Sequence, residues 1–276
     1  MLNSILVAVN GTAPSAAAQA MSLDLCRRLD AEIAGIAVLD RPWITAPQAV
    51  PIGASHYKYA RDHALIQRFE GEIDAQLKAL KDRCLKAGVP FSVAEWEGDP
   101  AERIEVESEA HDLIVVGKDT SFHFELADED SDTVKRLARD DPRPLIVTPE
   151  DLPTSGRILV ACDGSTAVSR SMHMFALLGL AEGATVEVLT VTEDAAEDAR
   201  RRAAQAAKVF ANHAVEATVT VVESEDHPAD ILIERAADAA MLVMGAFGRR
   251  QLRDVFFGSC TTRLLAACPV PLFIHH

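Results

Sequence analysis

Positive charge, aromatic side chains and long apolar runs are all scarce in this chain of 276 residues. Its 27 Lys and Arg face 42 Asp and Glu, which gives a formal net charge of −15. That balance argues against binding to nucleic acid or to an anionic membrane surface, because both need a positive protein surface. The sequence also contains no run of ~18 apolar residues, the length of a membrane span. We therefore expect neither a nucleic-acid partner nor a membrane span.

Several catalytic and metal-binding signatures are missing as well. The five cysteines form no CxxC pair and show no zinc spacing with histidine, so they are interpreted as reduced thiols of a cytoplasmic protein. There is no Walker A sequence, no GxSxG elbow, and no GxGxxG after the first expected strand. These absences leave P-loop, hydrolase and zinc-enzyme functions without support.

What the chain does contain is an internal repeat. Residues 5–12 (ILVAVNGT) match residues 158–165 (ILVACDGS), and residues 112–117 (DLIVVG) match residues 240–245 (AMLVMG). The two offsets are 153 and 128, so the first half carries an insert, near residues 41–61, that the second half lacks. Residues 149–156 hold two Pro and one Gly and are the expected linker. The repeat predicts domains at 1–150 and 156–276.

Each half alternates apolar runs of strand length with helical patterns. Strands are expected near residues 4–9, 32–39, 91–96, 112–116 and 144–148, and again near 157–162, 184–192, 216–223, 241–245 and 271–275. Helices are expected near residues 15–29, 62–87, 100–110 and from 131, and again near 166–179, 194–213, 228–239 and 259–267. Such alternation predicts an α/β fold of two tandem, doubly wound, parallel five-stranded sheets.

The last strand of each half, around residues 145–147 and 272–274, is apolar and resembles an edge strand. An open edge invites pairing with another strand. We therefore expect the two domains to pack on each other as an intrachain pseudo-dimer, and two chains to associate as a homodimer.

A glycine array follows the fourth strand of the second half, at the sheet edge where α/β proteins bind ligands. Gly245 and Gly248 are followed, after nine residues, by Gly258 and Ser259. Glycines allow close approach and unusual dihedrals, and a helix that begins at Gly258 would offer free N–H groups to an anion. Ser259 and Thr261 add hydroxyl donors. The full array predicts a phosphate site, although a lone glycine pair would more simply make a turn.

Charge supports the same interpretation. Residues 245–263 contain four Arg and one Asp, a local charge of +3 in an acidic chain. Asp163 ends the first strand of the second half, where a carboxylate can accept ribose hydroxyls or a magnesium-bound water. The same position suits a turn or N-cap Asp for the next helix, and both roles remain open.

With ILVACDGS and the terminal strand LFI, this array resembles the universal stress protein family in its tandem form, over nearly the whole chain. The resemblance implies a Rossmann-like fold similar to the adenine-nucleotide α-hydrolases. It also implies ATP, ADP or AMP as ligand, with Mg²⁺ held through Asp163, and a regulatory or protective stress-response role. Residue by residue it implies Asp163 beside adenine and ribose, Val191 on adenine, phosphates on Gly245, Gly248, Gly258 and Ser259, and Arg249 and Cys260 adjacent.

The first copy departs from this pattern. Gly117 to Ser131 keeps the spacing of Gly245 to Ser259, but Asn10, Thr120 and Asp130 replace Asp163, Gly248 and Gly258. Residues 117–135 hold two Lys and six acids, and carboxylates near a phosphate repel it by a few kcal/mol. We therefore predict that the first domain is degenerate and does not bind ATP. Its acids at 125–132 are interpreted as a solvated loop or, with His123, as a divalent-cation site.

Two other functions remain open at this point. A slow ATPase or nucleotidyl transferase needs a base or an activated water, and no second carboxylate or Lys is evident beside the array. We therefore assign no catalytic residue. A ligand-free interaction scaffold is the other alternative, and it would gain no stability from added ATP.

Overall fold

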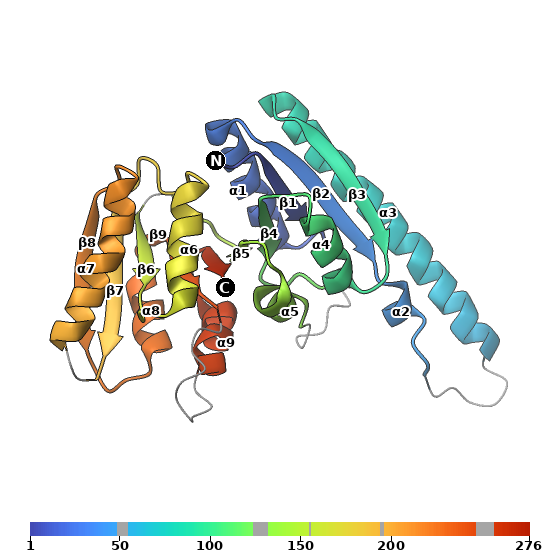
Figure 1. The fold of residues 1–276 in the computed structure, drawn as a ribbon. Helices are drawn as coiled ribbons and strands as arrows, with labels where there is room; N and C mark the ends of the chain where they lie inside the picture. Colours follow the sequence, from blue (N-terminus) through green and yellow to red (C-terminus); the bar gives the residue numbers. More distant parts are fainter. Residues whose placement is uncertain (49–54, 124–131, 155, 194–195, 247–256) are drawn as a thin grey trace.

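The structure is a computed structural model that describes residues 1–48, 55–123, 132–154, 156–193, 196–246 and 257–276. Within these residues the strands form a single sheet in the order β3-β2-β1-β4-β5-β10-β9-β6-β7-β8 (Figure 1). The first five strands belong to the first half of the chain and the last five to the second half. The repeat seen in the sequence is therefore a repeat in the fold.

The first half begins with β1 (Ser4–Ala8), all of whose residues are buried. Thr12 caps α1 through the N–H of Ser15, and Gly88, whose φ of +71° suits glycine, directly follows the end of α3. The other elements are α1 (Ala13–Leu29), β2 (Glu32–Leu39), α2 (Arg41–Ile44), α3 (Ser55–Ala87), β3 (Phe91–Glu97), α4 (Pro100–Ser108), β4 (Leu113–Gly117), α5 (Thr133–Asp140) and β5 (Leu145–Thr148).

The second half repeats this order without a counterpart of α2 among its described residues. Its elements are β6 (Arg157–Ala161), α6 (Thr166–Leu177), β7 (Val186–Thr192), α7 (Ala196–Asn212), β8 (Ala217–Glu223), α8 (Pro228–Ala236), β9 (Ala239–Gly245), α9 (Phe257–Ala267) and β10 (Leu272–His275). Strand pairs inside each half are parallel, with the central strands buried and helices packed against them. The predicted fold class is confirmed.

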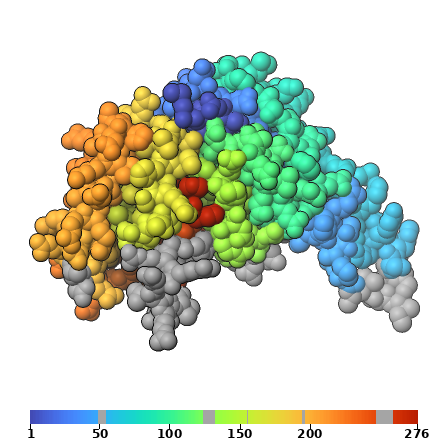
Figure 2. Space-filling view, in the orientation of Figure 1, coloured from blue at the N-terminus to red at the C-terminus, as the bar shows by residue number. Residues whose placement is uncertain are grey.

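The two halves are joined through their last strands. β5 and β10 pair antiparallel, with Ile146 opposite Phe273 at the centre of the register. Their apolar side chains are buried, and the C-terminal residues lie between the two halves (Figure 2). This pairing confirms the expectation that the two halves associate through these edges. Because β5 and β10 pair with each other, neither of these two strands is left as an open edge for a second chain.

The insert differs from its expected form. The long helix α3 begins at Ser55, seven residues before the expected start at residue 62, and the short helix α2 was not expected. Asp62 accepts hydrogen bonds from Lys58 and Arg61, and the Lys58–Asp62 pair has the i,i+4 spacing that favours a helix. No helix in the described parts of the chain combines the length and apolarity needed to cross a bilayer.

Candidate functional site

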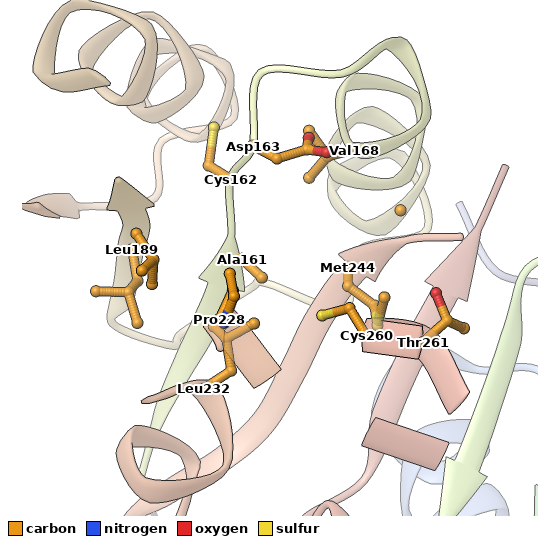
Figure 3. Close-up of a pocket in the computed structure, with 12 residues that line it drawn as sticks. Ala161, Cys162, Asp163, Val168, Leu189, Pro228, Leu232, Met244, Cys260 and Thr261 are labelled. Carbon is orange, nitrogen blue, oxygen red and sulfur yellow. The ribbon is translucent and has the colours of Figure 1, made fainter. Parts of the chain in front are cut away.

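A cleft of about 190 Å³ opens at the carboxyl end of β6, between the ends of β7 and β9 (Figure 3). Its walls are mostly apolar, and the polar groups come from the loop after β6 and from α9. The lining residues are Ala161, Cys162, Asp163, Val168, Leu189, Val191, Pro228, Leu232, Met244, Gly245, Cys260 and Thr261. The cleft therefore lies at the sheet edge where the sequence placed a ligand.

Five of the predicted site residues meet in this cleft: Asp163, Val191, Gly245, Cys260 and Thr261. They come from three strand ends and one helix, far apart in the sequence. The other four are not among the lining residues given above. Gly258 and Ser259 lie in the first turn of α9, while Gly248 and Arg249 fall outside the described residues.

Asp163 serves as a turn residue and also faces the cleft. Its Oδ1 accepts a hydrogen bond of 2.7 Å from the N–H of Ser165, whose own hydroxyl caps α6 by accepting from Val168. Gly164 between them has a φ of +73°, in the left-handed region that favours glycine. Of the two roles left open by the sequence, the turn role is therefore present, and the ligand role stays a prediction for a carboxylate that lines the cleft.

Gly245 has a packing role that its motif did not predict. Its φ is not positive, and an added Cβ would lie 2.3 Å from the nitrogen of Val168 at the start of α6. Gly117, its counterpart in the first half, meets the start of α1 in the same way, with a Cβ 2.7 Å from the nitrogen of Ser15. Both glycines allow a helix to approach a strand, so unusual dihedrals at Gly245 were a wrong expectation.

The main chain of Val191 lies at the apolar end of the cleft. Cys162 N–H donates to the carbonyl of Leu189 on the β6 side, whereas Ser224 N–H donates to the carbonyl of Thr192 on the β8 side. Successive residues of a strand point their N–H and C=O to alternate sides, so those of Val191 point toward β6. Because β6 ends at Ala161, they point beyond its last paired residue and toward the cleft.

His227 connects two helix starts beside the cleft. Its Nδ1 accepts from the N–H of Ala229 at 3.2 Å, which caps α8. Nε2 therefore carries the hydrogen, and it donates to the hydroxyl of Ser259 on α9 at 3.2 Å. The capping role of His227 is visible in its position before Pro228, but the contact with Ser259 joins residues 32 positions apart and has no local signal.

Cys260 contributes a neutral wall. Burial raises the pKa of its thiol to about 11, and the negative charge of Asp163 adds to the shift. Burial also raises the pKa of Cys162. At neutral pH both side chains are protonated thiols, which behave as small apolar groups. Among the described lining residues of the cleft, Asp163 is therefore the one charged side chain.

The expected positive charge is only partly visible. Arg263 pairs with Asp230 of α8, so its charge is directed at a carboxylate rather than at the cleft. The other three arginines of the array, at 249, 250 and 253, lie outside the described residues.

At the corresponding place in the first half, side chains of the described residues bridge the strand ends. β2 and β4 flank β1 in the sheet, Asp40 follows β2, and His123 lies in the loop after β4. His123 Nε2 and Asp40 Oδ2 are 2.9 Å apart, and Trp43 stacks on the imidazole with ring centroids 3.9 Å apart. This Asp40–His123 bridge crosses the carboxyl end of β1, where the second half has its cleft.

Most of the expected acidic loop of the first half lies outside the described residues. Residues 125 and 128–131 lie outside the described residues, and Asp132 precedes α5 without a side-chain capping bond. His123, considered with these acids as a cation ligand, is bound to Asp40. No cluster of three or more metal-ligating side chains occurs in the described ranges.

The apolar walls were not foreseen. Leu189, Pro228, Leu232 and Met244 line the cleft, yet each has the sequence pattern of an ordinary core or helix-start residue. They line a cleft because α8 packs against the sheet edge at this place, and the sequence pattern does not record that packing.

The chain is similar to known proteins along most of its length. The sequence profile of the universal stress protein family matches residues 1–122 and 154–276. Universal stress protein Slr1230 of Synechocystis sp. (strain ATCC 27184 / PCC 6803 / Kazusa) is 26% identical over 142 residues, which are 50% of this chain and 49% of that protein. The chain thus spans about half the length of this relative.

Two solved structures share the fold along nearly the full chain. A universal stress protein from Archaeoglobus fulgidus DSM 4304 gives a TM-score of 0.68 at 18% identity, covering 100% of this chain and 98% of that chain. The functionally unknown protein PA1789 from Pseudomonas aeruginosa PAO1 gives 0.61 at 19% identity, covering 99% and 92%. At such identities the likeness concerns the fold alone.

Proposed function

The chain belongs to the universal stress protein family, and from that premise we propose that its C-terminal half binds an adenine nucleotide, namely ATP. The observation that carries the proposal is the cleft at the end of β6, which gathers five of the predicted residues. The bound nucleotide would give the protein a regulatory or protective role in the stress response of the cytoplasm.

The apolar end of the cleft suits a purine base. Leu189 and Leu232 offer flat apolar contact, and the main chain of Val191 supplies one N–H and one C=O side by side. Adenine presents an acceptor at N1 beside a donor at N6, which is the complementary pair. Guanine presents a donor at N1 beside an acceptor at O6, so the same main-chain groups would leave it mismatched.

The other end suits ribose and phosphate. Asp163 can accept the ribose hydroxyls, or hold a water of Mg²⁺, with the oxygen that does not bind Ser165. Gly258 and Ser259 lie in the first turn of α9, where free N–H groups and the positive end of the helix dipole attract an anion. A stretched nucleotide would then span from β7 to α9.

Nucleotide binding is tested by calorimetry on the full chain with ATP, ADP, AMP and GTP, and by mass spectrometry of the small molecule that co-purifies. ATP at 100 times its dissociation constant should add about 2.7 kcal/mol of stability. GTP should bind at least tenfold more weakly than ATP.

The variant Gly258→Asp copies the first half at the matched position. It should weaken ATP binding at least 100-fold, because a carboxylate would stand beside the phosphates. Gly71→Asp is the matched control, since Gly71 is exposed on α3 with nothing within 4 Å of an added Cβ. Equal ATP affinity in Gly258→Asp and the wild type would refute the site.

Association of two chains is a separate expectation. β5 and β10 already pair within the chain, so a homodimer would form through another surface, such as the outer strands β3 and β8. Sedimentation with and without ATP would show whether nucleotide occupancy alters the pairing.

A further inference from the structure

We propose that the groove between α6 and α7 is a second ligand site, which takes an amphiphilic anion such as a medium-chain carboxylate. The groove measures about 510 Å³ and lies between two helices that run side by side on the second half (Figure 1). It adjoins the nucleotide cleft, because Cys162 and Val168 line both, but the other helical walls of the cleft come from α8 and α9 and those of the groove from α6 and α7. The proposal does not depend on nucleotide binding.

The lining of the groove combines an apolar floor with a cationic rim. Its floor is formed by Val168, Met172, Ala206 and Val209, and its rim carries Arg202 and Lys208 together with His173. None of the thirteen lining residues is an acid, although the chain has a net charge of −15. Within the described ranges no carboxylate forms an ion pair with Arg202 or Lys208, so both cations are free to meet an anion.

The first half provides an internal comparison for this helix pair. Gly88 after α3 and Ala214 after α7 both have positive φ, and the residue after each donates to a carbonyl five positions back. Counting back from these two points aligns the helices. Leu80 of α3 then corresponds to Ala206 of α7, and Leu77 corresponds to Ala203.

These two changes remove side-chain volume from the buried face of the helix, although the buried Phe210 stands where the first half has Cys84. Leu80 and Leu77 are buried between α3 and the sheet, whereas each corresponding alanine has three carbons fewer. A helix that packs through alanines leaves space along its flank unless the neighbouring helix moves in. The groove of 510 Å³ beside Ala206 is the space that remains.

The two halves also differ in the polar contacts between the paired helices. In the first half Arg83 of α3 donates to the side-chain oxygen of Gln19 on α1, which ties the two helices together. The corresponding positions in the second half are Val209 and Met172, which cannot form that bond and become floor residues. The first half closes this groove with its own side chains, and the second half leaves it open.

Arg202 stands where the first half has Gln76. Gln76 lies against Gly11, and Arg202 lies against Gly164, within 2.7 Å of an added Cβ in the second case. The change adds a positive charge above an apolar floor at the one end of the groove. An alkyl chain on the floor and an anionic head group at Arg202 would satisfy both features, since apolar burial and charge pairing favour different parts of one ligand.

The test is calorimetry of the full chain with laurate below its critical micelle concentration, with dodecyl maltoside as the uncharged probe. Laurate should bind with a stoichiometry of one, and dodecyl maltoside at least tenfold more weakly. Arg202→Gln, which copies the first half, should weaken laurate binding at least fivefold. Arg200→Gln is the matched control, because Arg200 is exposed on the same helix and does not line the groove.

A second variant addresses the floor. Ala206→Leu restores the first-half residue and should remove laurate binding, with its unfolding midpoint measured to confirm that the chain is folded. Gly258→Asp should bind laurate like the wild type, which separates this site from the nucleotide cleft. The proposal is overturned if laurate does not bind, if dodecyl maltoside binds equally well, or if Arg202→Gln and Arg200→Gln have the same effect.

Discussion

The two halves of this chain share a framework and differ in what lies at the ends of their strands. Both have five parallel strands in the same relative order, and both need a glycine, Gly117 or Gly245, where a helix begins against the fourth strand. Over β1, however, the Asp40–His123 bridge and Trp43 close the sheet edge, whereas over β6 a cleft is open. A duplicated fold thus fixes where a site can be, and a few loop residues determine whether it exists.

A second contrast concerns the helix pairs that pack on the sheet, α1 with α3 in the first half and α6 with α7 in the second. In the first half Leu77 and Leu80 fill the space between α3 and the sheet, and the Arg83–Gln19 hydrogen bond joins α3 to α1. In the second half alanines replace the two leucines, and a groove lies between α6 and α7. In the first half side-chain contacts occupy both places. Under the two proposals above, the first half would support the sheet and the second half would bind ligands.

The largest expected effect concerns the closed half. Phe122 lies in the loop after β4, five residues beyond Gly117, and is fully buried. Its φ of +60° is an unusual conformation for a bulky residue. Phe122→Ala should lower the free energy of unfolding by about 4 kcal/mol, as for other buried phenylalanines, and should not create ATP binding. Urea denaturation measures the loss. A loss below 1 kcal/mol would mean that packing does not hold this loop.

The paired glycines come next. Gly245→Ala and Gly117→Ala each bring a Cβ within 2.7 Å or less of the backbone at the start of α6 or α1, so both should cost about 3 kcal/mol of stability. Urea denaturation of the two variants gives the comparison. If Gly245→Ala were fully stable and only lost ATP binding, its role would be in the ligand site after all.

A chemical probe separates the open cleft from the closed core. Cys260 lines the cleft and has a pKa of about 11, so at pH 8 about one thiol in a thousand is ionised, and alkylation should be roughly two hundredfold slower than for a free cysteine. The rate should rise tenfold per pH unit below the pKa. ATP should slow it further, as followed by peptide mass spectrometry.

Cys26 of the first half is the control for that probe. It is fully buried, and burial, with smaller contributions from Cys84 and Glu32, raises its pKa to about 12. Its alkylation should be slower still and independent of ATP. Equal protection of both cysteines by ATP would indicate a global change in stability rather than occupancy of the cleft.

The smallest expected effect tests the helix connection. His227→Asn keeps a good N-cap for α8 but loses the reach to Ser259, so ATP should bind about fivefold more weakly, or about 1 kcal/mol. Asp99 caps α4 at the matched position of the first half, and Asp99→Asn should leave ATP binding unchanged. Calorimetry measures the ATP affinity of both variants. The same loss of affinity in both would contradict a specific role for the His227–Ser259 contact.

Asp99→Asn carries a pH signature of its own. Burial opposes ionisation of Asp99, but Arg136 and the N–H groups of α4 outweigh it and hold the pKa of this carboxyl below its usual value. Its contribution to stability is therefore present above the unfolded-state pKa near 3.8 and lost as pH falls through the lower folded value. The variant should differ from the wild type at pH 7 and converge with it in strong acid.

Much of the fold was readable from local pattern. Apolar runs of strand length marked β1, β4, β6 and β9, because strands buried on both faces are apolar throughout. The early start of α3 was not readable, since the residues before Asp62 carry no apolar stripe and the helix there is supported by Lys58 and Arg61. The position of Asp163 and Val191 at strand ends was enough to place them in one cleft.

Other parts of the site depended on contacts across the chain. The glycine array pointed to Gly245, but its reason, the approach of α6, is a packing distance that no sequence window contains. The same is true of His227 with Ser259, and of His123 with Asp40, which are 83 positions apart. Residues with the spacing of ordinary core, such as Leu232, became walls of a cleft only through where α8 packs.

The sequence by itself determined the duplication, the alternation of strands and helices, and the residue types at each strand end, because these follow from periodicity and local chemistry. Only the tertiary structure decided that β5 and β10 join the two halves into one sheet, and that one copy is closed where the other is open. The reason is physical: closure depends on side chains from distant loops meeting within a few ångströms, and hydrogen bonds and packing act only at that range.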